Sequence, residues 1–440
     1  MASVLRQMTM GEASFLSLLT DFIGKTEKLQ NNPPNLIPQE SLVVTKVLEV
    51  LGPYSIDNGG PLLLKPIYFQ GLQNRKNLIV TYPGEEQDRI VSIVGCHMDV
   101  VVADPTKWEH SPFKLTQLED GDTLYGRGTT DCLGHVALVT QLLKQMAEAK
   151  LRLKTTVAAV FIANEENATV LGIGADALMD AHELDFLKNG PLYWMDSSDK
   201  QPCIGTGGML AWHLTAHGKL SHSGLPKQGI NAIELASEGL KEIQDRFYND
   251  FPKVVPDEDN YKFDTPSTMK PTQWTYPGSA INQIPDTCTI SGDCRITPFY
   301  KVDEVEKKLV QYVDYINQNI EKLETRGPAS KYVLPDGTRG KLEITFDAEK
   351  MQGIACHMDS KGYKALAKAT EEVLGHVEPF SITGSLPIVG DLQDQGYDVQ
   401  TIGYGLTSAY HADNEICLLS DMSQGFKIFA ILIADLDNSL

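Results

Sequence analysis

The chain has 440 residues, of which 42% are hydrophobic, so it can bury a large core and form about two or three domains. Its 38 basic and 58 acidic residues give a formal net charge of −20, which opposes non-specific binding to nucleic acid. No apolar stretch reaches the roughly 18 residues of a membrane span, and the start lacks the apolar core of a secretory signal. We expect a cytoplasmic protein that binds neither nucleic acid nor membrane. Acidic Glu12 and Asp21 argue against a transit peptide, although a plastid location stays open.

Seven cysteines are scattered along the chain without a Cys-x-x-Cys pair, which indicates a reducing intracellular compartment. Cys96 and Cys132 each adjoin a candidate metal ligand, so one of them could act as a thiolate ligand or nucleophile. The alternation of a strand, however, turns Cys96 away from His97. We therefore expect the cysteines to be small buried residues.

The first half of the chain alternates helical and strand patterns. Apolar residues recur at helical spacing over residues 13–29, 40–51, 136–149 and 174–181. Strand patterns cover residues 77–82, 90–96, 155–163 and 191–195. The run at 155–163 is continuously apolar, as expected of a central strand that is buried on both faces. This order predicts an α/β domain with a mainly parallel, mixed sheet.

The pattern changes at about residue 205. Strands are predicted at residues 210–216, 272–276, 287–296 and 341–346, with helices at 231–247 and 302–323 and an irregular segment at 252–272. The chain then returns to α/β order with a helix at 362–373, a strand at 399–403 and a helix at 423–436. We expect a discontinuous catalytic domain of residues 1–205 and 355–440, and an inserted α+β domain of residues 206–354.

Two residues with metal-binding side chains end the strand at 90–96. His97 and Asp99 lie two positions apart and so share one face of an extended chain, where the carboxylate can hold the imidazole while the imidazole holds a metal. Asp131 follows in a glycine-containing loop before a helix, where backbone N–H groups and close approach to an ion are available. As an alternative, Asp131 simply caps that helix.

Further acidic residues and a histidine follow later strands. Glu165 and Glu166 come directly after the strand at 155–163, Asp196 ends the strand at 191–195, and His411 follows the last predicted strand. Adjacent acids in a loop are often no more than solvated charge, and an isolated histidine is often structural. Candidate ligands in five successive loops at one edge of an α/β sheet nevertheless indicate a common site.

The segments around these residues resemble a known family. The matching segments are Gly-Cys-His97-Met-Asp99-Val, Tyr-Gly-Arg-Gly-Thr-Thr-Asp131-Cys-Leu-Gly, Asn-Glu165-Glu166-Asn, Leu-Ser-His222-Ser-Gly, Ala-Ile-Asn282-Gln-Ile-Pro, Asp-Cys-Arg295 and Tyr-His411-Ala-Asp-Asn-Glu. In order and spacing they resemble the di-zinc amidohydrolases and peptidases that include aminoacylase, glutamate carboxypeptidase, succinyl-diaminopimelate desuccinylase and acetylornithine deacetylase. The resemblance runs from about Phe15 to the end of the chain.

The resemblance implies a zinc-exopeptidase-like catalytic domain and an inserted dimerisation or lid domain. It implies that Asp131 bridges two metal ions, with His97 and Asp196 on one ion and Glu166 and His411 on the other. Two Zn²⁺ per chain are expected, with Co²⁺ or Mn²⁺ able to substitute, because nitrogen and oxygen ligands discriminate poorly among these metals.

The resemblance also implies roles for residues that do not bind metal. Glu165 acts as general base, Asp99 orients His97, and His222 crosses from a partner subunit to polarise the scissile carbonyl. Without such a role His222 is a surface histidine in a turn. The substrate carboxylate is expected to be held by residues of the later segments: Asn282, Arg295, Gly384 and Ser385. Arg295 has a simpler alternative as a surface charge at a strand end.

The implied activity is hydrolysis of the amide of an N-acyl amino acid by a homodimer. The segments look most like plant-type acetylornithine deacetylases, which implies N-acetyl-L-ornithine as substrate and a place in arginine biosynthesis. A broader N-acyl-amino-acid hydrolase, a dipeptidase and a non-catalytic binding relative remain alternatives.

Some positions depart from the family pattern. Asp196 stands where glutamate is common, Leu133 replaces a frequent lysine, and Asn164 and Asn167 flank the glutamate pair where acids are usual. These changes alter the charge around the site without removing a ligand.

A second Cys-His-Met-Asp tetrapeptide occurs at residues 356–359. No apolar strand precedes it, and Asp359 and Ser360 lead into a helical pattern as a capping pair would. We therefore expect His357 to be structural.

Overall fold

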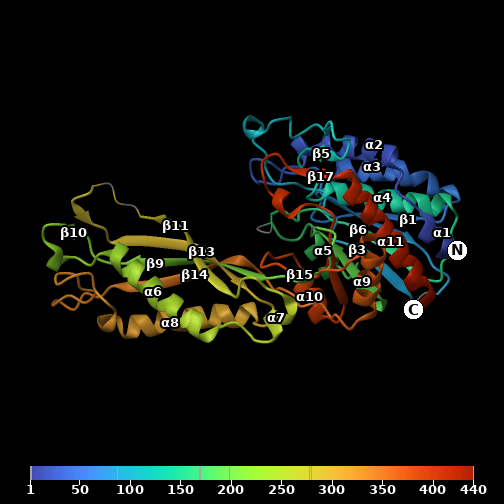
Figure 1. The fold of residues 1–440 in the computed structure, drawn as a ribbon. Coiled ribbons are helices and arrows are strands. Elements are labelled where there is room, and N and C mark those ends of the chain that lie inside the picture. Colours follow the sequence, from blue (N-terminus) through green and yellow to red (C-terminus); the bar gives the residue numbers. More distant parts are fainter. Residues whose placement is uncertain are drawn as a thin grey trace. The chain divides into compact units, whose positions relative to one another are not determined.

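The computed structural model describes residues 2–86, 88–167, 170–197, 199–276, 278 and 280–439. The chain divides into two compact units, each described by itself (Figure 1). The first unit comprises Met1–Ile204, Cys356–Phe380 and Pro387–Leu440, and the second comprises Gly205–Ala355 and Ser381–Leu386.

The return of Ser381–Leu386 to the second unit differs from the domain boundaries expected from sequence, which left it in the catalytic domain. Its place depends on backbone hydrogen bonds between Ile382 N and Gly205 O and between Gly207 N and Gly384 O. A segment this short carries too little periodicity to reveal such partners.

An eight-stranded mixed sheet forms the centre of the first unit. Its strands, in spatial order, are β1 (Leu63–Tyr68), β2 (Lys76–Tyr82), β6 (Thr156–Phe161), β3 (Ile90–Val94), β7 (Pro191–Met195), β16 (Asp398–Ile402), β8 (Cys203–Gly205) and β15 (Phe380–Ser381). The run from β6 through β3 and β7 to β16 is parallel, whereas β1, β2 and β6 pair antiparallel. The expected α/β fold with a mixed sheet is confirmed.

Sequence reasoning missed strand β1. It is an edge strand that pairs only with β2 among the described residues, and most of its side chains are exposed. Pro66 lies within it, which suits an edge because proline offers no N–H to a further strand. Such a strand lacks the apolar pattern from which buried strands are recognised.

Helices and a small sheet complete the first unit. The helices are α1 (Ala2–Gln7), α2 (Glu12–Ile23), α3 (Ser41–Leu51), α4 (Leu133–Glu148), α5 (Ala175–Asp180), α9 (Lys361–Leu374), α10 (Val389–Asp394) and α11 (Leu419–Ser439). The small antiparallel sheet contains β4 (Thr116–Gln117), β5 (Thr123–Tyr125) and β17 (Ile416–Leu418). A search of the described helices finds none with the length and apolar character to cross a membrane.

Helix α4 lies at the centre of the core. It is buried nearly all round, because it packs against α2, α3 and α11. A helix that is apolar on every face is stable only in such surroundings. Its first residue, Leu133, is fully buried, so the loop that ends at Cys132 is held firmly against the sheet.

The second unit is an α+β sandwich. Its antiparallel sheet has the order β11 (Thr268–Thr275), β13 (Thr287–Ile296), β9 (Gly208–His217) and β14 (Lys341–Met351). A separate two-stranded antiparallel sheet is formed by β10 (Ser221–His222) and β12 (Gln283–Ile284). The helices are α6 (Ala232–Asp250), α7 (Asp257–Tyr261) and α8 (Val302–Gln318). Residues of β9 alternate between buried and half-buried, because α6 and α8 cover one face of the sheet. The segment expected to be irregular contains the short helix α7 and the start of β11.

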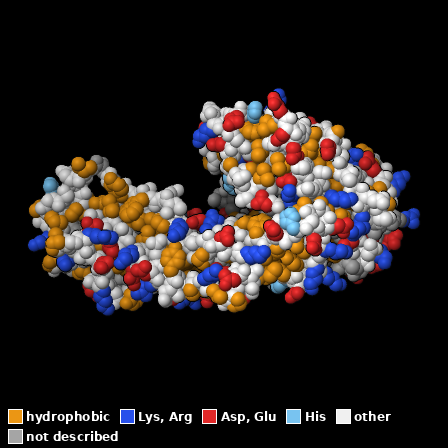
Figure 2. All heavy atoms as spheres, in the orientation of Figure 1, with side chains coloured by type: hydrophobic (Ala, Val, Ile, Leu, Met, Phe, Trp, Pro, Cys, Tyr) orange, Lys and Arg blue, Asp and Glu red, His pale blue; other side chains and the backbone are white. Residues whose placement is uncertain are grey.

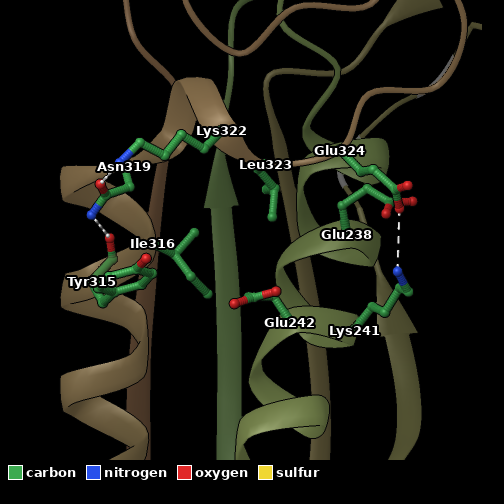
Figure 3. Close-up of a pocket in the computed structure, with 9 residues that line it drawn as sticks. All are labelled: Glu238, Lys241, Glu242, Tyr315, Ile316, Asn319, Lys322, Leu323 and Glu324. Carbon is green, nitrogen blue, oxygen red and sulfur yellow. Dashed lines mark hydrogen bonds and ion pairs between the residues drawn. The ribbon is translucent and has the colours of Figure 1, made fainter.

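The surface carries charges of both signs, interspersed over the visible face (Figure 2). Hydrophobic side chains also gather near β11, where Trp274 and Tyr276 are exposed. A cavity of about 290 Å³ lies between α6 and α8 (Figure 3), and the ion pair of Lys241 with Glu324 stands at its edge. This cavity contains none of the candidate catalytic residues.

Candidate metal centre

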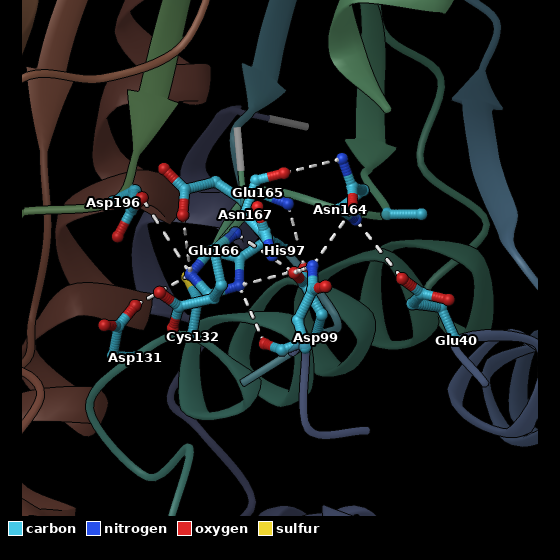
Figure 4. A network of polar contacts seen from close by, with 12 residues as sticks. Glu40, His97, Asp99, Asp131, Cys132, Asn164, Glu165, Glu166, Asn167 and Asp196 are labelled. Carbon is cyan, nitrogen blue, oxygen red and sulfur yellow. Dashed lines mark hydrogen bonds and ion pairs between the residues drawn. The ribbon is translucent and has the colours of Figure 1, made fainter. Parts of the chain in front are cut away.

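The candidate ligands of the first unit meet at one edge of the sheet. His97 follows β3, Glu165 and Glu166 follow β6, and Asp196 follows β7 directly. Asp131 comes from the loop before α4, and His411 from the loop between β16 and β17. The carboxyl ends of parallel strands lie at a common edge, so residues far apart in the chain converge there. Figure 4 shows most of this cluster around His97.

Asp131 lies between the two imidazoles. Its Oδ1 lies 2.7 Å from His97 Nε2, and its Oδ2 lies 3.2 Å from His411 Nε2. His411 Nε2 is also 3.0 Å from Glu166 Oε2. One carboxylate therefore presents an oxygen atom to each histidine, the arrangement required of a ligand shared by two ions.

Glu165 and Asp196 approach the same nitrogen atom of His97 as Asp131 does. The Glu165 Oε2 and the Asp196 Oδ2 are each 3.9 Å from His97 Nε2. Asp196 and His97 are buried, while the Glu165 side chain keeps 13% of its surface exposed. Glu165 is thus close to the ligands and still accessible to solvent.

The loops of the cluster are fixed by Asp99. Its carboxylate accepts hydrogen bonds from the backbone N–H groups of Glu165 and Glu166, each at 3.0 Å, and from Asn31 Nδ2 at 2.7 Å. His97 Nδ1 lies 2.9 Å from the carbonyl oxygen of Asp99 and 3.6 Å from its carboxylate. The backbone carbonyl is therefore the nearer partner of the imidazole, and Asp99 also anchors the glutamate pair.

Hydrogen bonds to carboxylates raise the pKa values of both histidines, although burial acts in the opposite direction. Burial alone lowers the pKa of His97, but hydrogen bonds with Asp131 and Asp99 outweigh it and hold that pKa well above its ordinary value. Hydrogen bonds with Asp131 and Glu166 raise the pKa of His411 to about 11. Both imidazoles thus lie in strongly negative surroundings.

The pKa values of the carboxyl groups shift in opposite directions. Burial, with the nearby charge of Asp131, raises the pKa of Glu166 to about 8, and burial raises that of Asp196 to about 7. Burial and the charge of Asp196 raise the pKa of Glu165 well above its usual range. Burial acts in the same sense on Asp131, but hydrogen bonds with His411 and His97 hold its pKa below the usual value. Asp131 is the member that stays ionised most readily.

The donor set fits a pair of divalent cations. Oε1 of Glu166 and Oδ1 of Asp196 are buried without a hydrogen-bond partner among the described residues. Buried polar atoms are rarely left in this state unless they bind something else. Ligand atoms of His97, Asp131 and Glu166 lie within 4.8 Å of one another. Imidazole and carboxylate donors suit zinc, and cations would relieve the repulsion among the acids.

Sequence reasoning assigned no role to Glu415, which organises the loop of Asp131. The Glu415 side chain is fully buried, and its carboxylate accepts from the backbone N–H groups of Gly128, Thr130 and Asp131 at 2.8–3.0 Å. Arg127 Nη1 donates to the same carboxylate at 2.8 Å. The sequence offered one sign of such a role, because Glu415 is an acid four positions after His411 in a segment that matches the family.

Asn164, which precedes the glutamate pair, is held in place by several hydrogen bonds. Its Oδ1 accepts from Asn31 Nδ2 at 3.0 Å and from Arg75 Nη2 at 2.9 Å, and its backbone N–H donates to Glu40 at 3.2 Å (Figure 4). Glu40 and Arg75 form a buried ion pair at 2.7 Å. These partners come from separate parts of the chain, so sequence spacing gives no sign of them.

The remaining candidates lie in the second unit. His222 is exposed on β10, and its Nδ1 accepts from Gly224 N at 2.9 Å. Asn282 is exposed beside β12, where its carbonyl accepts from Ser223 N. Arg295 lies one residue before the end of β13 and donates through Nη1 to Ser385 Oγ at 3.4 Å, so the second unit brings Arg295 and Ser385 together, whereas Asn282 lies beside the strand of His222.

Arg295 has a second contact that orients its guanidinium group. Its Nε donates to Asp293 Oδ2 at 2.7 Å. Gly384, which precedes Ser385, is exposed. Because the residues of this group belong to a different unit from the metal-centre residues, their roles toward that centre stay predictions.

The second tetrapeptide does not join the cluster. His357 is exposed, and Ser360 caps α9 by accepting from Tyr363 N at 3.0 Å. The expectation of a capping segment is confirmed. All seven cysteines are buried, as expected. The Cys132 sulfur, however, lies within 4.8 Å of ligand atoms of His97 and Asp196.

Comparison with known proteins identifies the class of protein to which this fold and cluster belong. The chain belongs to the peptidase family M20/M25/M40, whose model matches residues 93–435. The expected resemblance and the expectation of a metal-dependent hydrolase of this family are confirmed.

Particular relatives can also be named. The chain is 60% identical over 426 residues to an acetylornithine deacetylase of Arabidopsis thaliana, covering 96% of each protein. It is 49% identical over 430 residues to an acetylornithine deacetylase of Dictyostelium discoideum, covering 95% of this chain and 96% of the relative. Human carnosine dipeptidase 1 shares the fold with a TM-score of 0.69 at 16% identity, over 97% of each chain. The metallo-carboxypeptidase Sso-CP2 of Sulfolobus solfataricus does so with a TM-score of 0.72 at 16% identity, over 96% of this chain and 99% of that one.

Proposed function

We propose that this protein is an acetylornithine deacetylase, which hydrolyses N-acetyl-L-ornithine to L-ornithine and acetate. The observation that carries the proposal is Asp131 held between His97 and His411, with Glu165 beside them. The two relatives that bear this name align with nearly the whole chain, which supports the choice of substrate.

We propose that the site holds two divalent cations, zinc by preference, with cobalt or manganese able to substitute. Asp131 is the shared ligand, His97 and Asp196 complete one position, and Glu166 and His411 complete the other. When bound, the cations polarise the scissile carbonyl and make water more acidic.

Glu165 is proposed to move the proton. Its carboxylate takes a proton from the attacking water and delivers it to the nitrogen of the leaving amine. The Glu165 Oε2 lies 3.9 Å from His97 Nε2, and its side chain keeps 13% of its surface exposed, so the group can meet both the cations and the attacking water. Asp99 supports this role because its oxygens hold the backbone of Glu165.

The second unit is proposed to bind and polarise the substrate. Arg295 and Ser385, which lie 3.4 Å apart, hold the α-carboxylate with the backbone of Gly384. Asn282, which lies beside the strand of His222, contributes to the same carboxylate across a homodimer. His222, supplied across a homodimer, polarises the acyl carbonyl and stabilises the developing negative charge on its oxygen.

The homodimer is proposed to form through the second unit. Apolar side chains are unusually exposed there, which supports a contact surface. The residues concerned are Leu220, Leu225, Trp274, Tyr276 and Ile281. We place the enzyme in the cytoplasm, with a plastid as the alternative, and its reaction in arginine biosynthesis.

Substrate profiling tests the proposal. Rates should be compared for N-acetyl-L-ornithine, N-acetylmethionine, N-succinyl-diaminopimelate and several dipeptides, with metal content measured on the same samples. We expect the highest kcat/KM for N-acetyl-L-ornithine and about two ions per chain. Preference for another substrate would overturn the narrower name, and absence of any turnover by the fully loaded protein would indicate a binding relative.

A further inference from the structure

A buried chain of hydrogen bonds starts beside the candidate metal centre. The Cys132 Sγ lies 3.2 Å from His135 Nδ1 and 3.4 Å from the carbonyl oxygen of Met195. The backbone N–H of Tyr404 donates to His135 Nε2 at 2.8 Å. These residues are all fully buried. These hydrogen bonds therefore connect α4, the end of β7 and the segment that follows β16.

The direction of each hydrogen bond follows from the groups involved. A backbone N–H can only donate, so Nε2 of His135 accepts from Tyr404. A neutral imidazole then carries its hydrogen on Nδ1, which donates to the Cys132 sulfur. The thiol hydrogen is left to donate to the carbonyl of Met195. Burial lowers the pKa of His135 to about 4, which agrees with a neutral ring.

The same sulfur also faces the metal centre. It lies within 4.8 Å of ligand atoms of His97 and Asp196. Cys132 directly follows Asp131 in the chain, and Met195 directly precedes Asp196. The hydrogen bond from Cys132 to Met195 therefore joins the backbones that carry two carboxylate ligands. Metal–ligand distances fall within about 0.2 Å of their standard values, so a junction that fixes the backbones of two ligands can control cation affinity.

We propose that Cys132 and His135 are positioning residues that set cation affinity where His97, Asp131 and Asp196 meet, with the thiol acting as a hydrogen-bond donor and not as a ligand. The proposal rests on the metal centre proposed above. It adds residues that neither bind the substrate nor coordinate the ions.

The experiment uses four variants of the full-length protein. Cys132→Ala removes the thiol. Cys132→Ser keeps a hydrogen-bond donor, but on a shorter side chain. His135→Phe keeps a buried ring without its nitrogen atoms. Cys356→Ala is the matched control, because Cys356 is equally buried in the first unit and its Sγ also donates to a carbonyl, that of Cys203. Zn²⁺ and Co²⁺ dissociation constants are measured by chelator competition, with melting temperatures of the metal-free proteins and absorption spectra of the cobalt forms.

We expect Cys132→Ala and His135→Phe to weaken cation binding by about 10- to 100-fold, as loss of a ligand's supporting hydrogen bond does elsewhere. Cys132→Ser should recover part of the loss, and Cys356→Ala should bind like the wild type. A purely structural effect would lower the melting temperatures of the metal-free variants without this order of affinities.

Three results would overturn the proposal. Wild-type cation affinity in both Cys132→Ala and His135→Phe would show that these hydrogen bonds do not act on the metal centre. Equal weakening in Cys356→Ala would show a general effect of losing a buried thiol. A sulfur-to-cobalt charge-transfer band in the wild type, absent from Cys132→Ser, would make Cys132 a ligand. Failure of the metal centre itself is distinct, because the wild type would then bind no cation.

Discussion

The same four residues, Cys-His-Met-Asp, occur at 96–99 and at 356–359, and the protein uses them differently. The first copy follows β3 at the crowded edge of the sheet, and His97 and Asp99 are fully buried among other acids. The second copy precedes α9, and His357 is exposed. The comparison teaches that a candidate metal ligand is recognised by the strand end that presents it and by the carboxylates that lie beside it there.

The largest expected effect lies beside the first copy. Glu165→Ala should lower kcat by about 10²- to 10⁴-fold, because general acid and base catalysis contributes this much. Metal content should stay near two ions per chain, because Glu165 is not a proposed ligand. Steady-state kinetics and metal analysis of one preparation check both points. Wild-type turnover in this variant would remove the base assignment.

Replacement of each histidine by alanine, in two separate variants, tests the comparison directly. His97→Ala should lose cation from the position it shares with Asp196 and nearly all activity, because a buried ligand is removed. His357→Ala should keep both, because the exposed side chain is not part of the cluster. Metal analysis after dialysis and the rate with N-acetyl-L-ornithine measure the difference. Loss of metal from the His357 variant would contradict our interpretation of the second copy.

A smaller effect is expected from the support of the Asp131 loop. Glu415→Gln keeps the shape of the side chain but places an N–H₂ group against donors of Gly128 and Arg127. We expect cation affinity to fall by about 10- to 100-fold. Chelator competition measures this change. Glu372→Gln, on an exposed part of the surface, is the control and should bind cations as the wild type does.

The smallest effect belongs to the second copy. Ser360→Ala removes the side-chain cap of α9 and should lower the free energy of unfolding by about 1 kcal/mol. Cation affinity and kcat should not change. Denaturant unfolding of the metal-loaded protein provides the stability measurement. An altered metal content would show that the segment at 356–359 influences the centre after all.

Local pattern in the sequence predicted the buried strands β2, β3, β6 and β7 and placed candidate ligands at the ends of several of them. His97, Asp131, Glu165, Glu166 and Asp196 each stand where an apolar run stops or a glycine-containing loop begins. The carboxyl ends of parallel strands lie at a common edge of the sheet, so the α/β order predicts that these residues lie close together. The resemblance to a family then added roles that spacing alone does not reveal.

Only the tertiary structure shows which residues support the candidate ligands. Glu415 reaches back to the Asp131 loop, and Asn31 reaches both Asp99 and Asn164, across long separations in sequence. The link from Cys132 to Met195 and the return of residues 381–386 to the second unit are of the same kind. Periodicity reports only which face of an element is buried. The partner of a buried polar group depends on how elements pack, and this information is present only in the folded chain.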